Sequence, residues 1–183
     1  MNIEQIIQKA TSSCHSNTDI IGVVLAGGHS SRMGQDKALL KIESRSMMER
    51  TESVLKKVGL TKVVVSRNDG VAGHFSDILP NKGPLSGIHS IATRFPHYDL
   101  MIVPVDLPLL DPETILNLIK TGSENNKSCC YSDHNLPLFL KNTETTRQLL
   151  DYTLRCTNSY SVGRFCSHNP PIKLCKPKAS AIY

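Results

Sequence analysis

The stretch "DIIGVVLAGGHSSRMGQDKALL", Asp19 to Leu40, contains the strongest structural signal in this 183-residue chain. It opens with a continuous apolar run, which is typical of a strand buried on both faces of a sheet. Gly27 and Gly28 end that run, and a polar segment with two cations follows before the chain becomes apolar again. Glycine lets a backbone approach a ligand closely, and the turn after the first strand is a common ligand site in α/β sheets. The stretch therefore predicts a buried strand that ends in a binding turn.

Strand-like and helix-like segments alternate along the rest of the chain, from Ile20 to Arg155. This alternation predicts a single three-layer Rossmann-like α/β domain with a mostly parallel central sheet and helices on both faces. Pro104 falls inside one expected strand, where a proline is unusual at a central position. The expected strands are 20–25, 61–66, 98–106, 127–132 and 137–141, and the expected helices are 46–58, 84–95, 111–120 and 143–155.

Composition places the chain among soluble globular proteins, with 39% apolar and 20% charged residues. Residues 1–19 have a short amphipathic pattern followed by a polar Ser/Thr/Asn run, and we interpret them as a leader and linker before a domain over 20–183. No apolar stretch is long enough to cross a membrane, and none resembles a secretory signal. The six cysteines form no C-x-x-C motif, so we expect free thiols and a cytoplasmic location.

The net charge of +5 is concentrated near the C-terminus. From position 151 onward, Asp151 is the only acid against five basic residues: Arg155, Arg164, Lys173, Lys176 and Lys178. Two interpretations of this basic tail remain open, a solvated surface or a surface that faces phosphate. Aromatic residues make up 5% of the chain and tryptophan is absent, so we expect no nucleic-acid partner and no membrane partner.

The glycine-rich segment does not match the two common phosphate-binding patterns. The P-loop requires a lysine directly after its last glycine, whereas Lys37 lies three residues after Gly34. The dinucleotide pattern G-x-G-x-x-G fails because the glycines fall at 27, 28 and 34. Glycines alone are equally compatible with a tight strand-to-helix turn. The cations Arg32 and Lys37 in the same segment favour a site for phosphates.

The segment Leu25–Leu40 resembles the signature L-A-G-G-x-S-x-R-M-G-x-D-K-x-L of the MobA-like nucleotidyltransferase family. Two further matches follow in the expected order, "GPLSG" at Gly83–Gly87 and "VPVDLPLL" at Val103–Leu110. The resemblance extends over about Gly22–Leu140. It implies transfer of GMP from GTP to molybdenum-bearing molybdopterin with release of pyrophosphate, with Mg²⁺ as cofactor and transient contact with proteins that mature molybdoenzymes.

The resemblance also implies which residues form the site. Asp106 corresponds to the aspartate that binds Mg²⁺, and Arg32 and Lys37 would stabilise charge on the phosphates. Apolar residues surround Asp106 in the sequence, so its carboxylate is expected to need a compensating charge. The nucleotide-binding residues implied by the resemblance are Leu25, Ala26, Gly27, Gly28, Lys37, Ser66, Asp77, Gly83 and Asp106.

Two departures from the family pattern concern the nucleotide and the acceptor. Ser66 stands where the family's second strand often ends in asparagine, with Asn68 two residues later. The C-terminal segment, about 151–183, lacks the F-x-N-x-N-T-P-E-like motif associated with the pterin. The alternatives are therefore a related enzyme with another nucleotide or acceptor, such as a cytidylyl or sugar-1-phosphate transferase, or a non-catalytic GTP-binding protein.

Overall fold

A mostly parallel sheet runs through the middle of the molecule, in a computed structural model that describes residues 20–27, 36–42 and 44–175. Within these residues the sheet has seven strands in the order β5-β4-β1-β6-β8-β7-β9. Strand β8 is antiparallel to both of its neighbours, and the remaining pairs are parallel. The strands are β1 Ile20–Leu25, β4 Val63–Ser66, β5 His74–Phe75, β6 Asp99–Pro104, β7 Cys129–Tyr131, β8 Leu138–Leu140 and β9 Ile172–Leu174.

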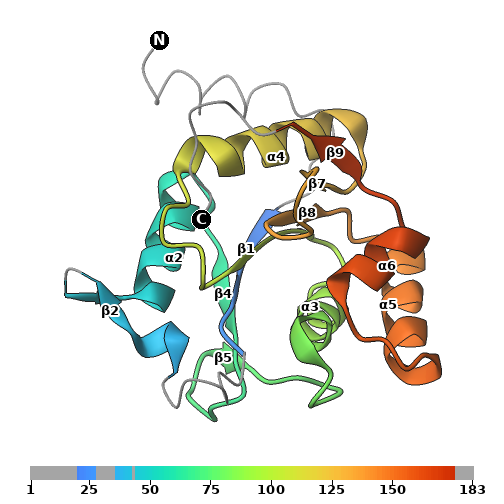
Figure 1. Cartoon of the computed structure of the whole chain (residues 1–183), viewed down its shortest axis with the longest axis horizontal. Coiled ribbons are helices and arrows are strands. Elements are labelled where there is room, and N and C mark those ends of the chain that lie inside the picture. The colour runs from blue at the N-terminus through green and yellow to red at the C-terminus, as the bar shows by residue number, and fades with distance from the viewer. Residues whose placement is uncertain (1–19, 28–35, 43, 176–183) are drawn as a thin grey trace.

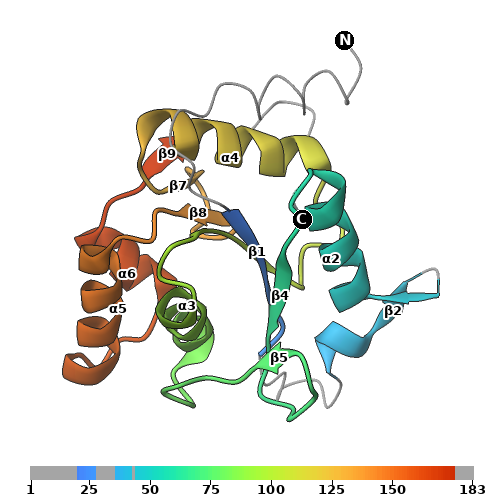
Figure 2. The same cartoon turned by 180° about the vertical axis from the view of Figure 1, so that it is seen from behind.

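Helices cover both faces of the sheet, as the alternating sequence predicts (Figures 1 and 2). Helices α2 (Met47–Lys57) and α4 (Pro112–Asn125) pack on one face. Helices α3 (Gly83–Arg94), α5 (Glu144–Cys156) and α6 (Val162–His168) pack on the other. The three-layer α/β architecture is therefore confirmed.

Alternating side chains of β6 supply both hydrophobic cores. Leu100 and Ile102 belong to the core under α3 and α5, whereas Met101 and Val103 belong to the core under α2 and α4. All four side chains are fully buried. Because both faces of this strand are covered, its sequence is a continuous apolar run rather than an alternation of apolar and polar residues.

Pro104 is compatible with a central strand because it is the last residue of β6. The strand pairs with β1 as far as Leu25 opposite Pro104, but its pairing with β8 has already ended at Ile102 opposite Leu138. The missing N–H of the proline therefore interrupts no ladder.

Local capping sets the helix starts where the sequence predicts them. Ser46 and Glu49 form a reciprocal capping box at α2, with the Ser46 amide donating to the Glu49 carboxylate over 2.7 Å. Asp111 caps α4 by accepting a hydrogen bond from the Thr114 amide over 2.7 Å, and Pro112 occupies the first helical position.

Several short elements were not predicted from the sequence. These are the 3₁₀ turn η1 (Lys37–Leu39), the hairpin of β2 (Lys41–Ile42) with β3 (Arg45–Ser46), strands β5 and β9, and helix α6. Each has two to seven residues, too few for hydrophobic periodicity to be read.

The five cysteines among the described residues are free thiols, as predicted. Burial raises the pKa of the Cys129 thiol to about 12 and that of Cys166 to about 11, which keeps both in the unreactive thiol form. Of the helices described, none is long and apolar enough to span a bilayer. The expected leader and linker, residues 1–19, lie outside the described residues.

The order of connections creates a switch point at β1. The chain passes from β1 through α2 to β4 on one side, and later from β5 through α3 to β6 on the other side of β1. Helices α2 and α3 lie on opposite faces (Figure 1). A crevice at the carboxyl ends of β1, β4 and β6 is the expected consequence, and this is where α/β sheets of this kind bind ligands.

Candidate active site

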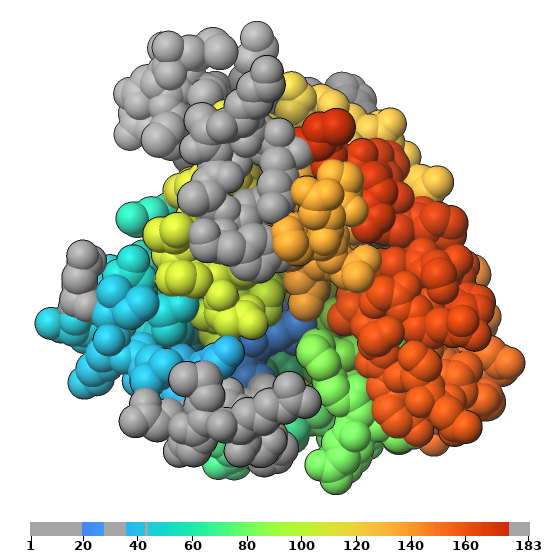
Figure 3. All heavy atoms as spheres, in the orientation of Figure 1, coloured from blue at the N-terminus to red at the C-terminus, as the bar shows by residue number. Residues whose placement is uncertain are grey.

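A pocket of about 560 Å³ lies at this carboxyl edge of the sheet. Its volume falls within the range of about 300–1,000 Å³ that is typical of small-molecule sites. In Figure 3 the blue atoms of the first strand are recessed between cyan, yellow-green and green segments. The lining residues are Leu25, Ala26, Gly27, Asp36, Lys37, Ala38, Ser66, Asn68, Asp77, Asn81, Gly83, Pro84, Gly87, Pro104, Val105, Asp106 and Leu136.

Every nucleotide-binding residue predicted from the sequence lines this pocket, except the one outside the described residues. Gly28, and with it the cation Arg32, falls in 28–35, for which no structural statement is made. The structure thus brings together residues from position 25 to position 106. A second depression of about 500 Å³ lies along α2, but only polar and charged residues of that one helix line it.

The end of β1 forms part of the pocket wall, with most of its backbone groups already bonded. The Ala26 amide donates to the Ser66 carbonyl over 3.0 Å, and the Leu25 carbonyl accepts from the Val105 amide over 3.3 Å. Within residues 20–27, 36–42 and 44–175, no hydrogen bond to the amide or carbonyl of Gly27 is observed. Gly27 is exposed, so among the described residues nothing blocks access of a ligand to its backbone groups.

Gly27 also leaves open space beside its backbone. A Cβ built on it would lie 3.7 Å from the Ser66 carbonyl oxygen, an ordinary contact, with no closer neighbour among the described atoms. A side chain at this position would therefore meet no steric conflict with the described atoms.

Lys37 opens the short turn η1, and its neighbour Asp36 caps that turn. The Asp36 carboxylate accepts a hydrogen bond from the Ala38 amide over 3.0 Å. Lys37 is exposed and lines the pocket. An exposed ammonium beside a backbone-lined strand end is suited to bind the phosphates of a nucleotide.

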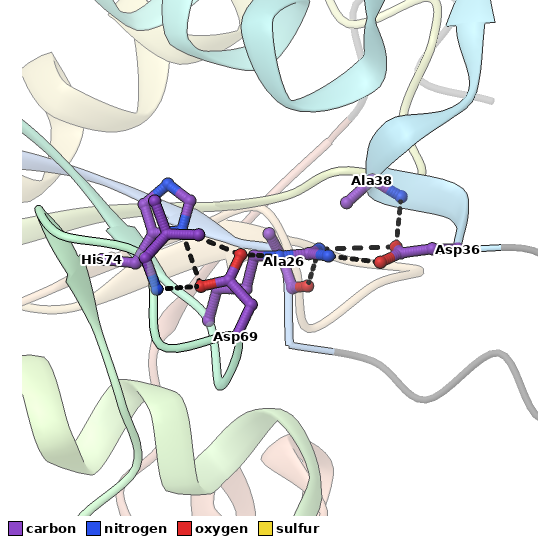
Figure 4. A network of polar contacts seen from close by, with 7 residues as sticks. Ala26, Asp36, Ala38, Asp69 and His74 are labelled. Atoms are coloured by element: carbon purple, nitrogen blue, oxygen red, sulfur yellow. Dashed lines mark hydrogen bonds and ion pairs between the residues drawn. The ribbon is translucent and has the colours of Figure 1, made fainter.

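Arg67, which was not predicted from the sequence, joins the two ends of the glycine-rich segment. Figure 4 shows this network, with Ala26, Asp36, Asp69 and His74 labelled. Its guanidinium donates to the Ala26 carbonyl over 3.1 Å and to both oxygens of the Asp36 carboxylate. Its Nε donates to Asp69, which is also paired with His74 over 2.9 Å. In the sequence Arg67 is a single cation after a strand, with no motif to mark it.

The pKa values of this cluster follow from its contacts. The hydrogen bond from Arg67 lowers the pKa of the Asp36 carboxyl against the opposing effect of partial burial, and the same bond raises the pKa of Arg67. For Asp69, desolvation opposes ionisation, but hydrogen bonds from His74, the Val71 amide and Arg67 together lower the pKa to about 2. Both carboxylates are therefore ionised at neutral pH.

Asp77 and Asn68 form a paired amide and carboxylate at the end of β4. The Asn68 side-chain amide donates to the Asp77 carboxylate over 2.9 Å, and the Asp77 backbone amide donates to the Asn68 side-chain oxygen over 2.7 Å. Ser66, in contrast, is 98% buried at the pocket floor. Of the two residues, the exposed Asn68 is therefore the more accessible to a ligand.

The start of α3 forms the opposite wall of the pocket, and its two glycines have different roles. Gly83 has φ +64°, a conformation that strains other residues. Gly87 is buried, and a Cβ there would lie 2.5 Å from the Ser66 hydroxyl and 3.2 Å from a Leu25 methyl carbon. Gly87 therefore lets α3 pack closely on β1 and β4. The helix start also directs unpaired amides and the positive end of the helix dipole toward this edge.

Asp106 lies two residues after the end of β6 and is exposed at the pocket, between the buried residues Val105 and Leu107. The expectation from the sequence that this carboxylate needs a compensating charge does not hold, because its apolar neighbours are buried in the core while Asp106 is exposed. No hydrogen bond or ion pair to this carboxylate is observed in the part of the chain that the structure describes. Its oxygens are therefore available to a ligand.

These donors suit Mg²⁺ bound together with a nucleotide. No group of three or more His, Cys, Asp or Glu side chains among the described residues is placed to hold a metal ion alone. Mg²⁺ commonly uses one or two protein carboxylates plus substrate phosphates and water. One available carboxylate in a pocket that also contains an exposed lysine fits this shared mode of binding.

None of the described basic residues of the C-terminal segment lines the pocket. Arg155 pairs with Asp151 over 2.7 Å on α5, and Lys173 on β9 donates to Asn135 over 3.5 Å. Arg164 lies on the exposed side of α6. Lys176 and Lys178 are outside the described residues. That the basic residues of the C-terminal segment contact an acceptor phosphate stays a prediction.

A doubly wound sheet with a pocket at its switch point places the molecule in the nucleotide-binding class of α/β proteins. More narrowly, the chain belongs to the MobA-like NTP transferase family, whose domain model matches residues 22–169.

Similar proteins support this family assignment. The chain is 39% identical over 130 residues to a molybdenum cofactor guanylyltransferase of Xanthomonas euvesicatoria, covering 70% of this chain and 68% of that protein. Its fold resembles the molybdopterin-guanine dinucleotide biosynthesis protein A of Archaeoglobus fulgidus, with a TM-score of 0.65 and 17% identity over 86% of this chain and 83% of that one. It also resembles a Mycobacterium tuberculosis protein solved in complex with manganese, with a TM-score of 0.61 and 20% identity over 87% and 89% of the two chains.

Proposed function

We propose that this protein is a guanylyltransferase that transfers GMP from GTP to a phosphate on molybdenum-bearing molybdopterin and releases pyrophosphate. The similarity to a molybdenum cofactor guanylyltransferase supports the reaction. The observation that carries the proposal is the single pocket in which the end of β1, Lys37, Asp77, the start of α3 and Asp106 meet.

Guanine would be recognised at the end of β1. Gly27 offers an amide donor and a carbonyl acceptor, and the guanine edge presents both kinds of group. The Asp77 carboxylate, held by Asn68, is a further acceptor for the guanine N–H groups or the ribose hydroxyls. Cytosine presents fewer donors on its edge, so this arrangement favours GTP over CTP.

The triphosphate would lie between Lys37 and Asp106. Lys37 supplies positive charge to the phosphate oxygens, and Arg32 adds a second cation by its place in the family signature. The amides at the start of α3 add a weaker attraction for anions. Charge of this kind stabilises the transition state of phosphoryl transfer.

Asp106 would hold Mg²⁺, together with the phosphates of GTP. When bound, the ion supplies charge neutralisation at the phosphate oxygens and helps to orient them. The complex of the Mycobacterium tuberculosis protein with manganese supports a divalent cation in this fold.

The reaction requires no nucleophile from the protein. An oxygen of the acceptor phosphate forms a bond to the α-phosphorus of GTP, while the bond from that phosphorus to the bridging oxygen breaks and pyrophosphate leaves. The contribution of this chain is to place the two substrates and to stabilise the negative charge, a role for which Lys37 and the start of α3 are positioned.

An alternative acceptor is favoured by one observation, the absence of the family's C-terminal pterin-associated motif from residues 151–183. In that alternative the nucleotide chemistry is the same, and another phosphate-bearing molecule accepts GMP.

A thermal-shift panel followed by a turnover assay tests the proposal. GTP with Mg²⁺ should raise the melting temperature more than CTP, ATP or UTP, because binding to the folded state alone stabilises it. Pyrophosphate should then be released only when GTP and molybdopterin are both present. Equal shifts for the four nucleotides would contradict guanine recognition. GTP binding without pyrophosphate release would contradict molybdopterin as the acceptor, and would leave either another acceptor or a non-catalytic GTP-binding protein.

A further inference from the structure

The Arg67 side chain links three segments at one corner of the pocket. Arg67 is the residue directly after β4, and its backbone amide donates to the Phe75 carbonyl over 3.0 Å, which fixes the residue to the edge of the sheet. Its side chain is 11% exposed. From there it reaches the end of β1 at Ala26 and the cap of η1 at Asp36.

Four of the five N–H donors of this guanidinium are committed to the protein. Nη1 contacts the Ala26 carbonyl and one Asp36 oxygen, Nη2 donates to the other Asp36 oxygen, and Nε donates to Asp69. Two carboxylates therefore neutralise its charge, and both are ionised at neutral pH. An arginine in this state is poorly suited to bind the phosphates of a nucleotide, so its role concerns the geometry of the protein.

The two groups that Arg67 holds belong to different halves of the pocket. Ala26 precedes Gly27, whose backbone faces the pocket, and Asp36 caps the turn that begins at Lys37. These two residues stand ten positions apart in the chain. The bidentate pairing of Arg67 with Asp36 sets both the distance and the orientation of the η1 turn relative to β1. A lysine ammonium, which acts as a point charge, would set only the distance.

Asp69 and His74 support the arginine from its other side. Asp69 accepts from Arg67 Nε, from the Val71 amide over 3.1 Å and from the His74 ring over 2.9 Å. His74 belongs to β5, which is paired with β4. The guanidinium is thus held from the sheet edge.

We propose that Arg67 is a positioning residue, which aligns Lys37 on η1 with the nucleotide-binding backbone at the end of β1. This inference rests on the proposed function, because it assigns Lys37 to the phosphates of GTP. Misplacing a substrate-binding group by about 1 Å costs on the order of a hundredfold in rate. Arg67 would therefore govern nucleotide binding and turnover without touching the nucleotide.

The first test compares Arg67→Lys with Arg147→Lys. Arg147 is a matched control, because it also holds backbone carbonyls, Pro96 over 3.1 Å and Asn142 over 2.9 Å, and it does not line the pocket. GTP affinity is measured by calorimetry with Mg²⁺, and melting temperature is measured without nucleotide. Arg67→Lys should weaken GTP binding by about tenfold or more, the loss that corresponds to one charge-assisted hydrogen bond. Arg147→Lys should bind GTP as the wild type does, even where its melting temperature falls.

The second test asks whether Arg67 acts through Lys37. In a Lys37→Ala background the phosphate contact is already lost, so Arg67→Lys should weaken GTP binding by less than half the factor it has in the wild-type background. Asp36→Asn provides an independent variant if Arg67→Lys does not fold. It keeps an oxygen to cap η1, removes the charged pairing, and should weaken GTP binding by a similar factor.

Four outcomes would overturn the proposal. These are unchanged GTP binding in both Arg67→Lys and Asp36→Asn, equal losses in the Arg147→Lys control, and full additivity with Lys37→Ala. The fourth is failure of the wild-type protein to bind GTP, which would overturn the proposed function together with this inference. The wild-type measurement thus separates the two failures.

Discussion

Replacement of Gly27 by alanine separates nucleotide recognition from folding, because the structure predicts opposite outcomes for the two. The added Cβ would lie 3.7 Å from the Ser66 carbonyl oxygen and would meet no other described atom within 4 Å. The backbone of Gly27 does not require a positive φ. The free energy of unfolding should therefore stay within about 0.5 kcal/mol of wild type, or rise by up to about 1 kcal/mol through reduced freedom of the unfolded chain.

GTP binding should weaken in the same variant. Gly27 lines the pocket, and the new methyl group lies beside its backbone amide and carbonyl, for which the described residues supply no partner. Loss of one or two backbone hydrogen bonds to guanine costs about 1–3 kcal/mol, or about 5- to 150-fold in the dissociation constant. CTP binding, which uses these groups less, should change less, so the preference for GTP over CTP should shrink.

Calorimetric titration with GTP and CTP, combined with denaturant unfolding, measures both effects in one preparation. Gly87→Ala is the matched comparison, because that glycine also lines the pocket but has no room for a side chain. A stable Gly27→Ala protein with unchanged affinity for both nucleotides would refute backbone recognition at this strand end. A large loss of stability would refute the packing argument.

Three further outcomes are expected. Gly87→Ala should lower the free energy of unfolding by about 1–3 kcal/mol in denaturant unfolding, because the added Cβ would lie 2.5 Å from the Ser66 hydroxyl. A free energy of unfolding equal to that of the wild type would contradict this close packing. Asp106→Asn should leave the melting temperature nearly unchanged, because Asp106 is exposed. It should abolish the Mg²⁺-dependent part of GTP binding and reduce the rate of GMP transfer by about a hundredfold or more. Undiminished magnesium dependence of GTP binding would contradict the assignment of Asp106 to the metal. Because the folded-state pKa of Asp69 is lowered to about 2, the stabilising contribution of its carboxylate is complete above about pH 4 and disappears as the pH falls toward 2. Asp69→Asn should therefore flatten this part of an acid-unfolding curve. An unchanged curve would contradict the contacts assigned to Asp69.

Local sequence patterns were sufficient to predict most of the architecture. The apolar runs of β1 and β6 indicate strands covered on both faces, because successive side chains point to opposite faces and all of them must then be buried. Asp111 with Pro112 predicts the start of α4, because capping depends on residues within one turn. The family signature identified Lys37 and Asp106, and the structure brings both to one pocket.

The sequence alone did not identify how the pocket is held together, because that depends on contacts between residues far apart in the chain. Arg67 follows a strand like many surface arginines, and only the pairing of β4 with β1 brings it to Ala26 and Asp36. The exposure of Asp106 likewise depends on how its apolar neighbours turn into the core.

Backbone availability at the strand end was also decided by tertiary structure. The signature marks Leu25, Ala26 and Gly27 alike, but parallel pairing to β4 and the contact with Arg67 occupy both backbone groups of Ala26. Gly27 extends beyond these contacts. Local sequence patterns specify which segments form strands and helices. The backbone amides and carbonyls left for a ligand are those that the assembled sheet does not use, and they depend on the tertiary structure.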